Sequence, residues 1–404
     1  MSVVGNVDQW SRESVSGWAA DPNDPDAEVE VVSLIDGTEV GRTVANLPRP
    51  DLRRTGRFGR GNHGFALRLP PLPVVSNYQV SIRPVGRDSP LPNGTRVFEP
   101  TAPEELERQL TVATIRELIP IIVTHIPRSG STLLMDILSK HNKVVVARHY
   151  PYEVKVAMYY ALAAQVMTAA GDHERSGSPT EFMRQSVSLP FDPYNHPTFY
   201  DVFGHESLAK FFFDDQVTAS TKEFCRSMVT KYYHTLAIAK GTVGALYFAE
   251  KCELSSTFRS TLRSLFPRLK ELVLVRDLRD TYCSYKKYFA HSDVTPEYAM
   301  QVIRNSAETL IGIKDANDPD VLFVRYEDCL LNASVALRGI YEFLGLEMGP
   351  ISVGADQMKL FDIHATSSSP AESIGRWKHD LVGDELKTFH TKVGPFLEAF
   401  GYDA

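Results

Sequence analysis

The residue types between positions 128 and 133 are suited to binding an anion. One guanidinium, three hydroxyls and a glycine follow one another here, in the order Arg128, Ser129, Gly130, Ser131, Thr132 and Leu133. The arginine supplies a permanent positive charge with bidentate geometry for phosphate or sulfate, and the hydroxyls can donate hydrogen bonds. The glycine lets the main chain approach a ligand closely. This composition predicts capture of a phosphate or phosphosulfate group.

The flanking pattern predicts a strand, a tight loop and a helix. An apolar, β-branched run begins at Ile121, the chain breaks at Pro127, and apolar residues at helical spacing continue to Leu138. A helix that begins at Ser131 offers unpaired N–H groups and the positive end of its dipole to an anion. The motif is not a Walker A loop, because G-x-x-x-x-G-K-[ST] is absent. An ordinary turn rich in Ser and Gly is the alternative for this segment alone.

Composition predicts a soluble chain of two domains. The 404 residues exceed one typical domain, and the net charge of −7 argues against a nucleic-acid partner. The four cysteines lack C-x-x-C or His-rich spacing, so we expect neither a zinc site nor a disulfide framework, and a reduced cytoplasm fits best. The N-terminus has no signal-peptide pattern, and no apolar run is long enough to span a membrane.

Residues 1–100 predict a small all-β sandwich. The segments 29–45, 64–70 and 78–85 alternate apolar and polar residues, and the first contains an Asp36-Gly37 turn signal. A Pro-rich stretch near residue 100 indicates the linker to a second domain.

Residues 101–404 predict an α/β domain with a doubly wound parallel sheet. After the first strand, further strands are expected at 143–147, 271–276 and 321–326. The first two strands are joined through one helix, so we expect a parallel pair. Residues 153 to about 265 are interpreted as largely helical, with an interruption at 188–204 that is typical of an acceptor pocket or a lid. Ligands of such sheets gather at the carboxyl ends of the strands.

Two polar residues follow the third predicted strand. Arg276 ends the strand, and Ser284 lies about two turns into the next helix. Together they could clamp a second phosphate, although Arg276 alone could equally be a structural ion-pair residue. The pattern 275–284, combined with 127–134, resembles the sulfotransferase family, whose members use 3′-phosphoadenosine 5′-phosphosulfate (PAPS).

Further segments match that family in its order. They are Phe266-Pro267, 324–346 and 374–378, so the resemblance runs from roughly residue 118 to residue 385. Many cytosolic members have Lys where this chain has Arg128, and the arginine resembles the tyrosylprotein and bacterial carbohydrate branches. The resemblance implies a P-loop-like sulfotransferase fold.

The resemblance also implies residues that bind the donor. Those that would hold the 5′-phosphosulfate, the 3′-phosphate or the nucleoside are Arg128, Ser129, Gly130, Ser131, Thr132, Leu133, Arg276, Ser284, Tyr326, Gly375, Arg376 and Trp377. Of these, Arg276, Ser284 and Arg376 would bind the 3′-phosphate, and Tyr326 would approach the nucleoside. Because no acidic cluster that could hold Mg²⁺ accompanies them, we predict no metal.

The resemblance implies several catalytic residues and leaves the choice of the base open. Arg128 suits the leaving-group side, Lys251 would stabilise the transferring group unless it is only a solvated lysine, and Ser367 resembles an assisting serine. The base is either His149 or Glu153: an imidazole has the suitable pKa, whereas the local resemblance favours the glutamate. Either could instead be a buried polar residue that orients the loop.

The acceptor class rests on the N-terminal domain. Segments of this domain resemble a β-sandwich module found beside bacterial glycosyltransferases and sulfotransferases, so a carbohydrate or glycoconjugate acceptor is expected. Trp10, Trp18 and Phe65 could line a sugar-binding surface, or they could pack in the core. The alternatives to a sulfotransferase are a nucleotide-dependent kinase and a non-catalytic sugar-binding scaffold stabilised by a nucleotide. The sequence does not predict the oligomeric state.

Overall fold

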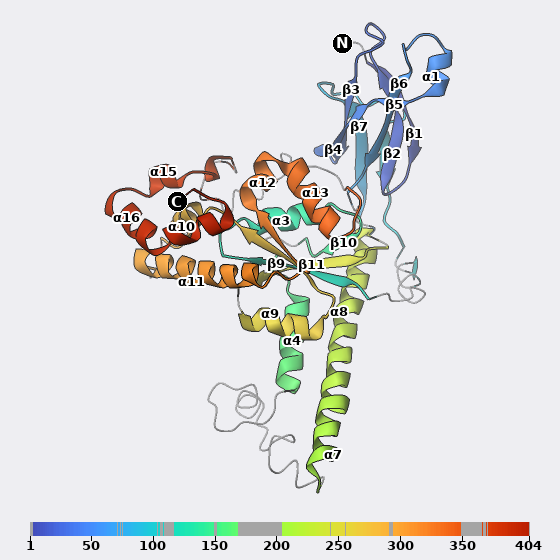
Figure 1. Cartoon of the computed structure of the whole chain (residues 1–404). Helices are drawn as coiled ribbons and strands as arrows, with labels where there is room; N and C mark the ends of the chain where they lie inside the picture. Colours follow the sequence, from blue (N-terminus) through green and yellow to red (C-terminus); the bar gives the residue numbers. More distant parts are fainter. Residues whose placement is uncertain are drawn as a thin grey trace.

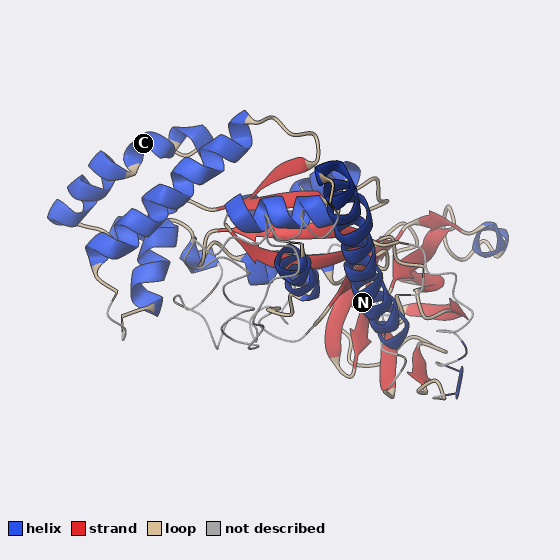
Figure 2. Cartoon of the chain, turned by 90° about the horizontal axis from the view of Figure 1, so that it is seen from below, coloured by secondary structure: helices blue, strands red, loops and turns tan. Residues whose placement is uncertain are grey.

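The computed structural model contains a β-sandwich and a larger α/β body (Figure 1). Figure 2 shows the strand-rich sandwich on one side of the molecule and most of the helices on the other. The described residues are 3–70, 72, 74, 76–102, 104–105, 108, 117–148, 152–168, 204–242, 244–254, 256–290, 294–348, 366, 369 and 371–403.

Two antiparallel four-stranded sheets form the sandwich. One has the order β1-β2-β6-β5 and the other β4-β3-β7-β8. The strands are β1 (Val4–Trp10), β2 (Ser14–Ala20), β3 (Val29–Ile35), β4 (Thr38–Ala45), β5 (Leu47–Pro48), β6 (Asn62–Arg68), β7 (Tyr78–Pro84) and β8 (Thr95–Phe98), with helix α1 (Pro50–Arg54) between β5 and β6. The all-β prediction for this part of the chain is therefore confirmed.

The turn between β3 and β4 is where the sequence predicted it. Asp36 and Gly37 adopt φ angles of 47° and 87°, which are the left-handed values that a tight hairpin requires. Alternate residues of the strands then face one core, and Phe65 belongs to that core with 2% of its surface exposed. Core packing is thus the correct interpretation of Phe65.

The α/β body is built on a five-stranded parallel sheet with the order β10-β11-β9-β12-β13. Its strands are β9 (Ile119–His125), β10 (Val144–Val146), β11 (Tyr247–Glu253), β12 (Lys270–Val275) and β13 (Val321–Arg325). The strand that comes first in the sequence is central, with later strands on both of its sides. The carboxyl end of β9 is therefore the topological switch point where a ligand crevice is expected.

Helices cover both faces of this sheet. The longer ones are α3 (Ser131–Leu138), α4 (Val156–Met167), α7 (Glu206–Phe211), α8 (Ala219–Lys240), α9 (Ser256–Leu265), α10 (Leu278–Tyr288), α11 (Pro296–Asp315), α12 (Tyr326–Leu331), α13 (Ala333–Phe343) and α16 (Gly383–Lys392). A π-helical stretch, η1 (Phe212–Thr218), joins α7 to α8, and the short helices are η2 (Ala371–Ser373), α15 (Trp377–Asp380), η3 (Gly394–Phe396) and η4 (Glu398–Phe400). In Figure 1 the α7–α8 rod extends well beyond α4 and α9.

Successive side chains of the central strands point to opposite faces of the sheet, so the core has a part on each face. Ile121 and Val123 of β9 pack with α3 and α13, whereas Ile122 packs with α4, α8 and α9 on the opposite face. In β12, Val273 and Val275 pack with α10, α11 and α16. The doubly wound α/β prediction is confirmed, since a parallel sheet must bury both faces.

Two details differ from the sequence prediction. The region 153–265 contains a strand, β11, in the stretch that was expected to be helical. This strand lies between β9 and β10, so those two are parallel members of one sheet but are not neighbours. The predicted lid at 188–204 lies outside the described residues except for Gly204.

Polar contacts join the sandwich to the α/β body. Arg68 of β6 pairs with Glu347 at 2.6 Å, and Asn142 donates to Glu13 at 3.4 Å. Gly241 at the end of α8 lies directly against the Leu72 carbonyl, which a Cβ would approach to 2.2 Å. The domain boundary at residue 100 stays a prediction. Among the described helices, none is both long and apolar enough to span a membrane.

Candidate functional site

The loop after β9 has an unusual backbone. Arg128 has φ of 75°, which is rare for a residue with a side chain, and Gly130 has φ of 98°. A Cβ on Gly130 would lie 2.3 and 2.4 Å from two ring carbons of Tyr326. Gly130 is therefore required both by its backbone angle and by the aromatic ring that packs on it.

Helix α3 begins directly after this loop, as the sequence predicted. Because α3 directly follows β9, the N–H groups of its first turn lie near the carboxyl end of that strand. The Ser129 hydroxyl, 1% exposed, has no hydrogen-bond partner among the described residues. Leu133 differs from its neighbours, since its side chain is buried in the core and its N–H donates to the Gly130 carbonyl at 3.0 Å.

Arg276 reaches this loop from the end of β12. Its Nη1 donates to the Arg128 carbonyl at 3.2 Å, its Nη2 donates to the Ser373 carbonyl, and its guanidinium lies 4.8 Å from the centre of the Tyr326 ring. The Tyr326 hydroxyl in turn lies 3.0 Å from the Ser373 hydroxyl. The structure thus joins Arg276, Tyr326 and the loop after β9, although about 150 residues separate the first and last of these in sequence.

The Arg128 side chain packs against helix α10. Its guanidinium lies over the Tyr288 ring of α10, 4.3 Å from the ring centre. Such a contact favours a cation by roughly 0.5–1 kcal/mol at an exposed site. Tyr288 was not singled out from the sequence, because a tyrosine near the end of a helix carries no distinctive signal.

Ser284 and Arg376 meet at a third residue, Thr366. The Ser284 hydroxyl lies 2.9 Å from the Thr366 hydroxyl, and Arg376 Nη1 donates to the same hydroxyl at 2.8 Å. Arg376 also pairs with Asp380, at 2.5 Å from Nη2. Of the three residues predicted to bind the 3′-phosphate, Ser284 and Arg376 therefore lie together, and no sequence pattern singled out Thr366 between them.

Asp280 holds the segment that carries Arg376. Its carboxylate accepts the Gly375 N–H at 2.7 Å and the Trp377 N–H at 2.9 Å, and it is 1% exposed. Burial raises the pKa of Asp280 above its ordinary value, against the opposing effect of these donors. Arg279 lies over the Trp377 ring at 4.0 Å and forms an ion pair with Asp277 at 2.9 Å.

On the other side of the loop, Lys251 of β11 is 3% exposed. Its ammonium donates to the Thr132 hydroxyl at 3.0 Å and to the Glu153 carboxylate at 3.1 Å. Lys155 pairs with the same carboxylate at 3.0 Å. Burial pushes the pKa of Glu153 upward, but Lys251 and Lys155 outweigh it and leave that pKa below its ordinary value. Glu153 is therefore ionised at neutral pH, and Lys251 is not a solvated lysine.

Two predicted catalytic residues lie outside the described residues. They are His149 and Ser367. The choice between His149 and Glu153 as the base stays open, and the contact with Lys251 is an observation for Glu153 alone. Among the described residues, no group of three or more His, Cys, Asp or Glu could hold a metal ion, and the four buried cysteines form no disulfide.

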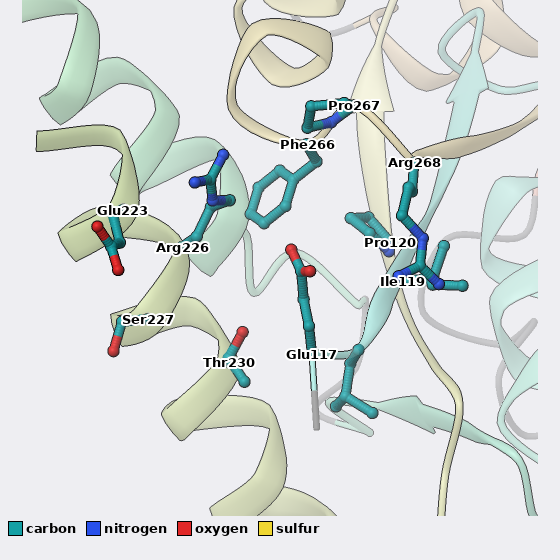
Figure 3. Close-up of a pocket in the computed structure, with 11 residues that line it drawn as sticks. Glu117, Ile119, Pro120, Glu223, Arg226, Ser227, Thr230, Phe266, Pro267 and Arg268 are labelled. Atoms are coloured by element: carbon teal, nitrogen blue, oxygen red, sulfur yellow. The ribbon is translucent and has the colours of Figure 1, made fainter. Parts of the chain in front are cut away.

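A cavity of about 580 Å³ lies at the opposite edge of the sheet (Figure 3). Ile119 and Pro120 begin β9 there, and Glu117, Glu223, Arg226 and Arg268 add charges of both signs around Phe266. Because parallel strands run from this edge toward the Arg128 loop, the cavity is separate from the constellation described above.

The sequence matches one known protein family. A family model described as the sulfotransferase family matches residues 120–350, which is more than half of the chain. No curated protein matches the sequence.

Three solved structures illustrate the similarity. The sulfotransferase domain from the curacin biosynthetic pathway is 15% identical, with a TM-score of 0.40 over 69% of this chain and 98% of that one. The sulfotransferase domain from the Synechococcus PCC 7002 olefin synthase is 16% identical, with a TM-score of 0.41 over 72% and 97%. A mouse sulfotransferase complexed with PAP (3′-phosphoadenosine 5′-phosphate) is 12% identical, with a TM-score of 0.34 over 74% of this chain and 91% of that one. On the strength of the family match, this chain belongs to the sulfotransferase family and is a sulfotransferase.

Proposed function

We propose that the protein moves a sulfuryl group from PAPS to a hydroxyl of a carbohydrate or glycoconjugate. The observation that carries this proposal is the hydrogen bond from Arg276 to the carbonyl of Arg128. It brings the Arg276 guanidinium, from a strand about 150 residues along the chain, to the loop that carries Arg128 and opens α3. A donor with negative charge at both ends requires such an arrangement.

The donor would lie across the carboxyl end of β9. The N–H groups that begin α3 and the hydroxyls of Ser129, Ser131 and Thr132 would bind the 5′-phosphosulfate. The buried Ser129 hydroxyl fits this role, since a polar atom without a partner in the protein suits a ligand acceptor. Arg128 would neutralise charge on the leaving phosphate.

The 3′-phosphate would lie at the cluster around Thr366. Ser284 and Arg376 both contact that residue, and Arg276 reaches the Ser373 carbonyl nearby in sequence. The Tyr326 ring beside Gly130 would contact the nucleoside, and Asp280 would keep Gly375 and Trp377 in place. Leu133 would contribute by holding the start of α3, because its side chain is in the core and its N–H bonds the Gly130 carbonyl.

Transfer needs an acceptor hydroxyl in line with the bond that breaks. As the acceptor oxygen forms its bond to sulfur and the sulfur–phosphate oxygen bond breaks, Glu153 would take the hydroxyl proton and PAP would leave. Lys251 contacts both Thr132 and Glu153, so its ammonium would stabilise charge on the transferring group. His149 is the alternative base, and Ser367 would assist transfer.

The acceptor class is supported by the resemblance of the sandwich to modules beside carbohydrate-modifying enzymes. Trp18 packs on Phe58 with ring centres 5.3 Å apart, and the Trp10 indole donates to the Asn93 carbonyl at 3.1 Å. Both tryptophans are partly exposed and Phe65 is not. A sugar surface would therefore use the tryptophans without Phe65.

Labelled donors test the proposal. The purified protein is incubated with labelled PAPS or labelled ATP and with a panel of glycans, lipids, phenols and peptides, and products are identified by mass. We expect sulfated glycans with PAPS, no phosphorylated product with ATP, and strongly reduced transfer by Arg276→Ala. Lys387→Ala removes an exposed cation from α16 and serves as the matched control.

Other outcomes would contradict the proposal. Phosphate transfer from ATP would identify a kinase, and glycan binding without transfer by the wild-type protein would identify a scaffold. Sulfated phenols or peptides without sulfated glycans would refute only the acceptor class.

A further inference from the structure

Glu250 is a buried carboxyl group that the proposed reaction does not use. It precedes Lys251 in β11 and is 1% exposed. Because side chains alternate along a strand, Lys251 faces α3 and the Arg128 loop, whereas Glu250 faces the layer of α4 and α8. One strand thus presents two adjacent charged residues to opposite faces of the sheet.

The Glu250 carboxyl group caps the start of α4. Its Oε1 accepts the Ala157 N–H at 2.7 Å, and its Oε2 accepts the Met158 N–H at 3.4 Å. The residue at the N-cap position, Lys155, makes no capping hydrogen bond with its own side chain. Tyr233 of α8 completes the arrangement by donating its hydroxyl to Oε1 at 2.5 Å. The first turn of α4 is therefore held by a residue from the sheet, where a local Ser or Asp usually serves.

This cap restricts the segment that carries Glu153. Only three residues separate Glu153 from Ala157, and Tyr152 on the other side is anchored to α3 through a 3.1 Å hydrogen bond to Asp136. Tyr152 has φ of 67°, a strained value for an aromatic residue. Glu153 is thus fixed at both flanks, by α3 before it and by Glu250 after it.

We propose that Glu250 is a positioning residue that sets Glu153 against Lys251 by capping α4 from the far face of β11. The inference rests on the proposed role of Glu153 as the base. The cap maintains the contact between Glu153 and Lys251. Without it, the first turn of α4 frays, and the Glu153 carboxylate is no longer held 3.1 Å from the Lys251 ammonium.

The charge state of Glu250 indicates which variant should preserve the cap. Burial raises the pKa of Glu250 to about 7, against the hydrogen bonds from α4 and Tyr233. Tyr233 and Tyr232 are the ionisable groups that face it, and α4 contributes backbone N–H groups. A glutamine keeps one acceptor oxygen, which can serve the two short contacts that Oε1 makes with Ala157 and Tyr233. It loses only the 3.4 Å contact of Oε2 with Met158, so it should preserve most of the cap.

The test compares Glu250→Ala, Glu250→Gln and Tyr233→Phe. Misplacing a catalytic group by about 1 Å can cost up to about a hundredfold in rate, so we expect Glu250→Ala to lower kcat at least tenfold. PAP affinity, measured by calorimetry, should stay within about twofold, because the cap lies on the α4 and α8 side of β11 whereas the donor loop lies on the other side. Glu250→Gln should restore most of kcat. Tyr233→Phe should lower stability with little change in kcat, since the α4 cap remains.

The pH profile separates positioning from a general loss of stability. Among the described residues, the ionisable groups that face Glu153 are Lys251 and Lys155, and both lower its pKa. In Glu250→Ala the contact between Glu153 and Lys251 is lost, so the pKa of Glu153 should rise. The acid limb of the kcat/KM profile, where activity falls as Glu153 is protonated, should therefore move to higher pH. Glu250→Gln and Tyr233→Phe should keep the limb in place. If Glu250→Ala does not fold, Glu250→Asp replaces it, because its shorter side chain keeps the charge but withdraws the oxygens from α4.

Two results would overturn the inference. One is an unmoved acid limb with nearly wild-type kcat in Glu250→Ala or Glu250→Asp. The other is a parallel loss of PAP affinity and kcat. Glu153→Gln keeps the two proposals distinguishable: full activity in that variant would refute the base assignment itself, whatever the Glu250 variants do.

Discussion

The two ends of the proposed donor site are built in different ways. The loop after β9 is a contiguous run in which the backbone supplies the geometry, with φ of 98° at Gly130 and a helix that begins at the next residue. The cluster around Thr366 joins residues from separate segments: Ser284 lies 82 residues before Thr366, and Arg376 lies 10 residues after it. The first end depends on local conformation, whereas the second depends on anchors such as Asp280. Substitutions at each end should therefore fail for different physical reasons.

The largest effect should come from Gly130→Ala. The new Cβ would lie 2.3 Å from the Tyr326 ring, and the backbone angle would be strained as well. We expect PAP affinity to fall by about a hundredfold or more, since the loop must move to relieve the clash. Calorimetric titration with PAP measures this. Gly339→Ala in α13 is the matched control, because its Cβ meets nothing within 4 Å. Equal affinities in the two variants would show that this loop is not the binding element.

The next largest effect should come from Arg376→Ala. Hydrogen bonds to charged groups contribute roughly 1.5–3 kcal/mol, which corresponds to about a 10- to 150-fold loss of PAP affinity. Adenosine 5′-phosphosulfate, which has no 3′-phosphate, should lose little affinity in the same variant. If both ligands weakened equally, Arg376 would not act at the 3′-phosphate.

Asp280→Asn tests whether the second end depends on its anchor. One amide oxygen cannot accept both the Gly375 and the Trp377 N–H groups as the carboxylate does, and the amide nitrogen would meet a donor. We expect PAP affinity to fall about tenfold, in line with one lost charge-assisted hydrogen bond. Asp384→Asn, on an exposed position of α16, should have no effect. Wild-type affinity in Asp280→Asn would mean that the segment holds itself in place.

The smallest effect should come from Ser284→Ala. It removes one neutral hydroxyl beside Thr366, and such a hydrogen bond contributes about 0.5–1.5 kcal/mol, or roughly a two- to tenfold change in affinity. The measurement is again PAP titration, with Ser284→Thr as the variant that keeps a hydroxyl. A loss larger than that of Arg376→Ala would reverse the order of importance at this end.

Strand β11 was not predicted from the sequence. β11 carries Glu250 and Lys251 in its middle, and two adjacent charges interrupt the apolar run that identifies a buried strand. Both charges are compensated only in the folded protein, Glu250 by α4 and Tyr233, and Lys251 by Thr132 and Glu153. A pattern method treats such residues as solvent-exposed, so it assigns the segment to the helical region around it.

The sequence alone determined the features that depend on neighbours along the chain. These are the strand, loop and helix around Gly130, the strand that ends just before Arg276, the hairpin at Asp36 and the all-β character of the first domain. Local backbone preference and hydrophobic alternation are sufficient for such features. Only the tertiary structure decided the order of strands around β9, the meeting of Ser284 with Arg376 at Thr366, and the placement of Lys251 beside Glu153. Those contacts join residues that are far apart in the chain, and their energies exist only once the sheet has buried both of its faces.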